Sequence, residues 1–219
     1  MKKILFLSAL VLLFISCAGA QNDRTRVEIR TTLGDIVVEL FNETPIHRDN
    51  FIQLVEENLF DGMLFHRCIR DFMIQGGDPD SRNAAPGQML GINSIGETLP
   101  AEFVPELIHV RGALAAARQG DNVNPQRRSS GSQFYIVTGR PLSQQQMEAM
   151  NMNREVQWTA EQIQLYTTYG GAPHLDMLHT VFGQVVSGMD VVERISRVPV
   201  DRNSRPVEDV VMSMRILRR

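Results

Sequence analysis

The chain has 219 residues, of which 43% are hydrophobic and 21% are charged. This is an ordinary globular balance, and the length suits one or two domains. The formal net charge of -3 does not favour a nucleic-acid partner, because such proteins usually carry a concentrated basic surface.

The start of the chain is typical of a secretory signal peptide. Lys2 and Lys3 precede an apolar run from Ile4 to Ile15, which is too short for a stable membrane span. We therefore expect residues 1–20 to be a signal peptide, residues 21–26 a short polar tether, and residues 27–219 one domain.

The sequence leaves two cleavage sites open. Residues 18–20 (Ala-Gly-Ala) lie before Gln21 and fit an ordinary signal peptide cut at that point. Residues 14–17 (Phe-Ile-Ser-Cys) instead resemble a bacterial lipobox, in which Cys17 becomes the lipidated first residue and anchors the protein to a membrane. We expect a location in the periplasm or on a membrane of a bacterial envelope.

Cysteine usage argues against a disulfide framework. The chain has two cysteines, Cys17 and Cys68, and either way of cutting the signal leaves Cys68 without a useful partner. Cys68 alternates with apolar residues, so we interpret it as a small buried hydrophobic side chain rather than a catalytic thiol.

The first half of the chain predicts a hairpin, a helix and a second strand pair. Apolar and polar residues alternate around the turn at residues 32–35, as in a hairpin with one inward face. Thr44 and Pro45 fit the start of a helix as capping hydroxyl and first helical residue. Residues 64–75 indicate strand, turn and strand, and residues 80–100 are rich in loop formers.

The second half predicts further strands with helical segments between them. Residues 112–117, 133–138 and 181–186 are apolar enough for buried strands, and alternation from 210 to 216 indicates a closing strand. Residues 142–166 and 187–195 are expected to be helical. Many short strands without regular strand–helix alternation favour an antiparallel barrel.

Familiar catalytic sets are not apparent in the sequence. The five histidines show no metal-ligand spacing, and the residues around Ser132 lack the frame of a nucleophile elbow. Three other motifs do carry a pattern. They are residues 65–79 (FHRCIRDFMIQGGDP), residues 130–136 (SGSQFYI), and residues 174–183, which begin HLD and end HTVFG.

These ordered motifs closely resemble the signatures of the cyclophilin-type peptidyl-prolyl cis-trans isomerases, over residues 27–217. The resemblance implies a mainly β fold: a closed eight-stranded antiparallel barrel capped by two α-helices. The main departure is an insertion at about residues 141–172, which we expect to be helical and to pack on the barrel or bind a partner. No cofactor and no metal are implied, and the substrates implied are proline-containing polypeptides.

The chemistry implied needs one well-placed donor. Rotation about a peptide bond has a barrier of ~18–20 kcal/mol, and a catalyst must favour the twisted amide over both planar forms. The resemblance assigns this catalytic role to Arg67, whose charged and planar guanidinium is rich in N–H groups. It also implies a substrate-binding groove made of His66, Phe72, Met73, Gln75, Ala117, Gln133, Tyr135, Leu175 and His179.

Within that groove, the resemblance distinguishes three roles. Phe72, Met73, Tyr135 and Leu175 would hold the proline ring. Gln75 would orient Arg67, while Gln133 and Ala117 would meet the substrate backbone.

Two departures from the family pattern affect the expected partners. Many members carry tryptophan at the position of His174, so we expect weak binding of cyclosporin. Arg127 and Arg128 lie in a lengthened loop, where they edge the groove or are simply solvated. Two functions remain open: an isomerase that assists folding of exported proteins, and a proline-peptide-binding chaperone or complex subunit whose isomerase activity is incidental.

Overall fold

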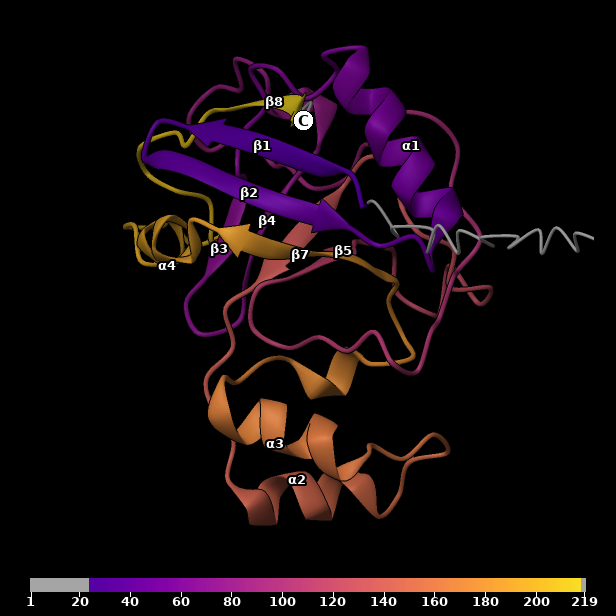
Figure 1. Cartoon of the computed structure of the whole chain (residues 1–219). Helices are drawn as coiled ribbons and strands as arrows, with labels where there is room; N and C mark the ends of the chain where they lie inside the picture. Colours follow the sequence, from indigo (N-terminus) through magenta and orange to yellow (C-terminus); the bar gives the residue numbers. More distant parts are fainter. Residues whose placement is uncertain (1–23, 218–219) are drawn as a thin grey trace, which may run out of the picture.

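Eight strands form one antiparallel sheet in the computed structural model, which describes residues 24–217. Neighbouring strands follow the order β3-β4-β6-β5-β7-β2-β1-β8 (Figure 1). The strands expected from the sequence are present, with small shifts at their ends. Their bounds are β1 Arg26–Thr31, β2 Gly34–Leu40, β3 Arg67–Ile69, β4 Met73–Gly76, β5 Ala113–Ala116, β6 Phe134–Val137, β7 Val181–Ser187 and β8 Met212–Leu217.

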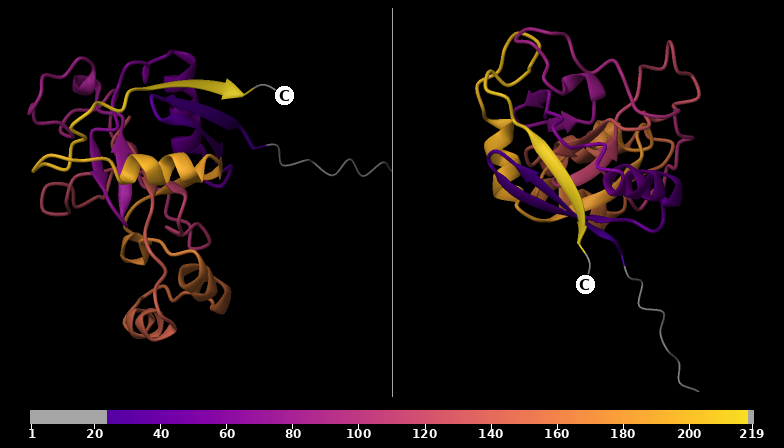
Figure 2. Two further views of the ribbon diagram at one scale, coloured as in Figure 1. Left: turned by 90° about the vertical axis from the view of Figure 1, so that its left-hand side faces the viewer. Right: turned by 90° about the horizontal axis from the view of Figure 1, so that it is seen from above.

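The sheet is strongly curled (Figure 2). The segment before β3 pairs with the segment entering β8 through an isolated antiparallel bridge between Leu64 and Val211. Backbone hydrogen bonds flank this bridge, from Phe65 N–H to Val210 O at 3.0 Å and from Met212 N–H to Met63 O at 2.8 Å. The mainly β, eight-stranded barrel expected from the sequence is therefore confirmed, with a short seam closing the curled sheet.

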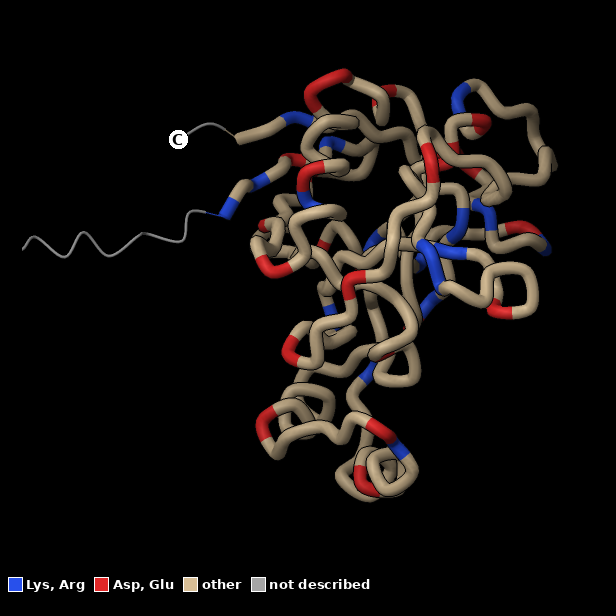
Figure 3. Tube along the Cα trace, turned by 90° about the vertical axis from the view of Figure 1, so that its right-hand side faces the viewer, with Lys and Arg blue, Asp and Glu red and all other residues tan. Residues whose placement is uncertain are grey.

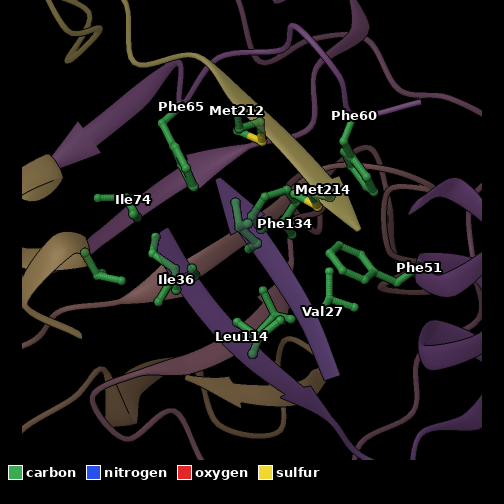
Figure 4. Close-up of a cluster of buried hydrophobic side chains, with 14 of the residues drawn as sticks. Val27, Ile36, Phe51, Phe60, Phe65, Ile74, Leu114, Phe134, Met212 and Met214 are labelled. Atoms are coloured by element: carbon green, nitrogen blue, oxygen red, sulfur yellow. The ribbon is translucent and has the colours of Figure 1, made fainter. Parts of the chain in front are cut away.

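The interior of the barrel holds the main hydrophobic core. Val27 and Ile36, on neighbouring strands, are fully buried, as the alternation of their strands predicts. Phenylalanines fill the end beneath the first helix, where the Phe51 ring meets the Phe134 ring edge-on at 5.6 Å between centroids. Figure 4 shows these side chains converging on one centre. This packing fixes the strands whose outer surfaces carry the site.

Two helices cover the barrel, as expected. Helix α1 (Pro45–Glu56) packs on β7 and β8, and helix α4 (Met189–Ser196) packs on β2, β3 and β4. No helix within residues 24–217 combines the length and apolar character that crossing a membrane requires. The predicted signal peptide, Cys17 and most of the predicted tether lie outside the described residues.

The start of α1 differs from the sequence prediction in one respect. Thr44 occupies the cap position, but its hydroxyl makes no capping hydrogen bond. The Glu102 carboxylate, from a loop distant in sequence, caps the helix instead. It accepts hydrogen bonds from the backbone N–H groups of Ile46 at 3.1 Å and His47 at 3.0 Å. The capping prediction for Thr44 was therefore wrong, because a partly buried carboxylate is the stronger acceptor for these N–H groups.

The insertion forms two helices rather than one. Helices α2 (Gln144–Asn151) and α3 (Ala160–Thr168) each begin with a capping box. They extend away from the barrel as a separate lobe (Figures 1 and 2). Met147, Trp158 and Tyr166 from this lobe pack with Ile108 into a small core of their own. Packing on the body of the protein, one of the two alternatives for the insertion, is thus confirmed for these residues.

Candidate active site

Most of the predicted groove residues line a single cavity on the outer surface of the barrel. The cavity has a volume of about 420 Å³. Its predicted lining residues are Arg67, Phe72, Met73, Gln75, Ala117, Tyr135, Leu175 and His179. Leu90, Gly91 and Arg118 complete the wall. The expectation that three separate motifs meet at one groove agrees with this arrangement.

Strand register brings the polar side of the cavity together. Arg67 on β3 lies opposite Gln75 on β4, and Gln75 lies opposite Tyr135 on β6. The Arg67 Nη1 donates to Gln75 Oε1 at 3.2 Å, and Gln75 Nε2 donates to Gln133 Oε1 at 2.9 Å. Gln133 Nε2 then donates to the Asn93 carbonyl at 2.7 Å. This chain of amides fixes the direction of the guanidinium.

The Arg67 guanidinium is partly desolvated and keeps donors free for a ligand. Burial lowers the pKa of Arg67, although an arginine stays protonated at any physiological pH. Within residues 24–217 no carboxylate forms a salt bridge with it. Its side-chain hydrogen-bond partner among the described residues, Gln75, is neutral. A cation without a counter-ion in a half-buried site is a strong hydrogen-bond donor.

The apolar side of the cavity is built from rings and thioethers. Met73 and Tyr135 are 2% and 4% exposed, so their positions are fixed by the surrounding strands. Phe72 is half-buried and its ring contacts the exposed His174 ring at 5.6 Å between centroids. Such a slot can hold a compact ring such as proline without forming specific polar contacts.

The two histidines predicted for the groove occupy different places. His179 lines the cavity, and its ring meets the Tyr135 ring edge-on at 5.7 Å. His66 is 3% exposed and lies beneath the Gly91 backbone rather than on the cavity wall. Burial lowers the pKa of both His66 and His179 to about 4. Both rings are therefore neutral near pH 7, and neither is set up as an acid.

A second cavity adjoins the first and has a volume of about 600 Å³. Gln75, Gly91, Ala117 and Arg118 line both, and Gln133 lines this second one. The groove thus has room for residues flanking a bound proline.

Arg127 and Arg128 of the lengthened loop were expected either to edge the groove or to be solvated, and the structure places them differently from each other. Acidic and basic residues interleave along the chain (Figure 3). Arg128 lines the second cavity, with its Nε donating to Thr98 Oγ1 at 2.7 Å. Arg127 is not among the lining residues and pairs with Asp121 at 3.2 Å. One arginine therefore edges the groove, while the other is held by a neighbouring carboxylate.

The loop of residues 80–98 supplies lining residues that sequence reasoning missed. Asp78, at the end of the first motif, accepts the backbone N–H groups of Gly91 and Ile92. This carboxylate holds the loop against β4 and places Leu90 and Gly91 on the cavity wall. The contact spans more than a dozen positions of irregular chain, so no periodic signal could have predicted it.

Other reactive groups are scarce near the groove. Cys68 is 2% exposed, and burial raises the pKa of its thiol to about 12. No group of three or more potential metal ligands occurs among the residues that the structure covers.

Comparisons with known proteins agree with this geometry. The family profile described as "Cyclophilin type peptidyl-prolyl cis-trans isomerase/CLD" matches residues 26–216. A Staphylococcus epidermidis protein named as a peptidyl-prolyl cis-trans isomerase is 34% identical over 193 residues, covering 88% of this chain and 91% of the relative. A Streptococcus pyogenes protein named as a bifunctional phosphatase/peptidyl-prolyl cis-trans isomerase is 38% identical over 193 residues. The match covers 85% of this chain but 37% of that longer protein.

A solved structure supports the same fold. The cyclophilin-type isomerase of Cryptosporidium parvum superposes with a TM-score of 0.65 at 24% identity, covering 90% of this chain and 99% of the other. With a family profile matching nearly all described residues and a bacterial relative matched along most of both chains, this protein belongs to the cyclophilin-type peptidyl-prolyl cis-trans isomerases.

Proposed function

We propose that Arg67 catalyses rotation about X-Pro bonds in exported polypeptides while the apolar side of the cavity holds the proline ring. In the twisted amide the nitrogen lone pair is localised, so a donor aimed at it stabilises that state and not the planar forms. The single observation that carries this proposal is the Arg67–Gln75–Gln133 chain beside the slot formed by Phe72 and Met73.

The site does not need proton transfer for this reaction. Rotation breaks no covalent bond, and the histidine that lines the cavity, His179, has a pKa lowered to about 4 by burial. Gln75 is the positioning residue, because its amide oxygen holds Arg67 Nη1 while its amide nitrogen is held by Gln133. The guanidinium therefore meets the substrate in a fixed direction, which lowers the reorganisation that the twisted state requires.

The test is a protease-coupled prolyl-peptide assay on the wild type and Arg67→Ala. Removing one preorganised donor typically costs about a hundred- to thousandfold in rate, and we expect kcat/KM to fall by that amount. Arg30→Ala is the matched control, because Arg30 lies on β1 away from both cavities and pairs with Glu28. A variant at Arg67 that keeps wild-type turnover would refute the catalytic role.

A binding role is the second candidate, and the adjoining cavity of about 600 Å³ favours it. Two adjoining cavities of this volume can hold the segment around a proline even without turnover. Arg67→Ala separates the two roles, because binding to Phe72, Met73 and Gln133 should survive the loss of the donor. Cells that need the protein but tolerate Arg67→Ala would show that binding is the cellular function.

Export rests on the sequence of the first residues. The basic pair at Lys2 and Lys3, followed by the apolar run to Ile15, supports a signal peptide, and Cys17 supports lipidation. Mass spectrometry of the mature N-terminus distinguishes a lipidated Cys17 from a free end at Gln21. An unprocessed Met1 in cells would contradict the proposal of export.

A further inference from the structure

Asp176 is the centre of a buried polar cluster that lies outside the cavity. Its side chain is 4% exposed. One oxygen accepts the backbone N–H and the ring Nδ1 of His109, each at 2.8 Å. The other accepts Trp158 Nε1 at 2.7 Å and the Tyr166 hydroxyl at 2.6 Å. A backbone N–H and an indole N–H can only donate, so both oxygens act as acceptors.

The donors of this cluster come from two different parts of the fold. Trp158 and Tyr166 belong to the helical insertion, and their rings pack edge-on at 5.8 Å between centroids. His109 belongs to the barrel, in the segment leading into β5. Asp176 directly follows Leu175, one of the predicted groove residues, in the sequence. The carboxylate therefore joins the insertion to the barrel directly behind the site.

The far side of His109 reaches the cavity wall. Its Nε2 lies 2.9 Å from the Tyr135 hydroxyl, and the two rings are stacked at an angle of 14°. With Nδ1 donating to the carboxylate, a neutral imidazole has its acceptor at Nε2. The Tyr135 hydroxyl then donates to His109, and burial raises the pKa of Tyr135 well above its ordinary value, which keeps this proton in place.

We infer that the helical insertion positions the aromatic wall of the proline slot through Asp176 and His109, with Tyr166 and Trp158 as positioning residues for Tyr135. The inference rests on the proposed function, because it assigns Tyr135 to substrate binding. The insertion thus acts on the site through this series of hydrogen bonds, although none of its residues lines the cavity of about 420 Å³.

Packing alone would not require this arrangement. Met147 and Ile108 already give the insertion an apolar contact with the body of the protein. Burying a tyrosine hydroxyl and an indole N–H is unfavourable unless both are bonded, so phenylalanines would make a simpler brace. The polar groups instead form a series of hydrogen bonds from the Tyr166 hydroxyl through Asp176 and His109 to the Tyr135 hydroxyl. This series fixes the orientation of the Tyr135 ring, which apolar packing alone would not do.

The experiment is a double-mutant cycle between the two ends of the series. Tyr166→Phe removes the hydroxyl at the insertion, and Tyr135→Phe removes the hydroxyl at the cavity. Tyr169→Phe is the matched control, because Tyr169 is 54% exposed at the end of the same helix. For each variant, NMR measures the Kd of a prolyl tetrapeptide together with KM and kcat for its isomerisation.

We expect Tyr166→Phe to raise Kd and KM by about three- to tenfold, the range typical of residues that couple to a site without touching ligand. The kcat should change little, because a loosened wall weakens binding of planar and twisted forms alike. In the Tyr135→Phe background the same substitution should leave Kd unchanged, because the series is already broken. Tyr169→Phe should match the wild type throughout.

Two results would overturn the inference. One is an equal effect of Tyr166→Phe on Kd in both backgrounds, which would indicate independent structural effects. The other is an unchanged Kd with a lowered Tm, which would make Tyr166 a stability residue only. The measurement of Kd does not depend on turnover. A folded wild type that binds the peptide without isomerising it would therefore refute the proposed catalysis, while the double-mutant cycle in Kd would still test the role of Tyr166.

Discussion

Replacement of Asp176 by asparagine tests the buried cluster through stability. The substitution keeps the shape of the side chain but exchanges one acceptor oxygen for an NH2 group. Each oxygen accepts two donors, so either orientation of the amide turns a donor toward two other donors. Rotation of the Tyr166 hydroxyl can relieve one of these conflicts, and the Trp158 N–H can relieve none.

The cost follows from the bonds lost. Hydrogen bonds to charged groups contribute about 1.5–3 kcal/mol each, so two of them amount to roughly 3–6 kcal/mol. The neutral amide avoids part of the desolvation cost of a buried carboxylate, which favours the lower part of that range, about 3–4 kcal/mol. At about 2–4 °C per kcal/mol for a chain of this size, Tm should fall by roughly 6–16 °C.

Thermal unfolding followed by circular dichroism measures this shift. Asp190→Asn is the matched control, because Asp190 is exposed on α4 and its salt-bridge partner, Arg194, is an exposed neighbour on the same helix. Its Tm should stay close to that of the wild type. A Tm for Asp176→Asn within about 2 °C of the wild type would contradict the count of bonds, since it corresponds to less than about 1 kcal/mol.

Three further predictions concern other regions. Burial lowers the pKa of His66 from 6.5 to about 4 in the folded state, so the unfolded state binds more protons between these two pH values. The free energy of unfolding should therefore fall as pH drops from about 6.5 to 4. Urea unfolding across this range should show a smaller fall for His66→Asn than for the wild type. Glu102→Ala should cost about 1–3 kcal/mol by freeing two N–H groups of α1, whereas Thr44→Val should cost almost nothing; equal urea midpoints for the two variants would contradict the assignment of the cap. Cyclosporin should inhibit weakly, and His174→Trp should tighten inhibition in the peptide assay; nanomolar inhibition of the wild type would refute the role given to His174.

Much of the fold could be predicted because its strands carry a local signal. Val27 and Ile36 are inward residues of an alternating pattern, and the structure buries both completely. The break between α2 and α3 could not be predicted in this way. Residues 142–166 are rich in Gln, Met and Glu, and this composition alone favours one continuous helix. The chain turns near Trp158, where the ring packs beside Tyr166 and its N–H reaches Asp176, and α3 starts at the capping box of Thr159 and Gln162. Tertiary contacts of this kind override local propensity.

The site shows the same division between local and distant causes. Arg67, Met73 and Gln75 could be predicted together because they lie within one short motif that folds into a strand pair. His66 shares that motif, yet its side chain is 3% exposed beneath the Gly91 backbone and does not line the cavity. Asp176 had no predicted role beyond its place in the third motif, and His109 had no predicted role at all, because their partners lie far away in the sequence.

The inaccessible thiol of Cys68 has a consequence for how this protein tolerates its surroundings. A thiol with a pKa of about 12 and almost no exposure offers neither a thiolate nor a path for an oxidant. Within residues 24–217, then, no covalent cross-link has to form before the barrel is complete, and none can be lost to a reductant. Glutathione, dithiothreitol or air should leave the folded barrel unchanged, so folding of the barrel needs no enzyme that forms disulfides.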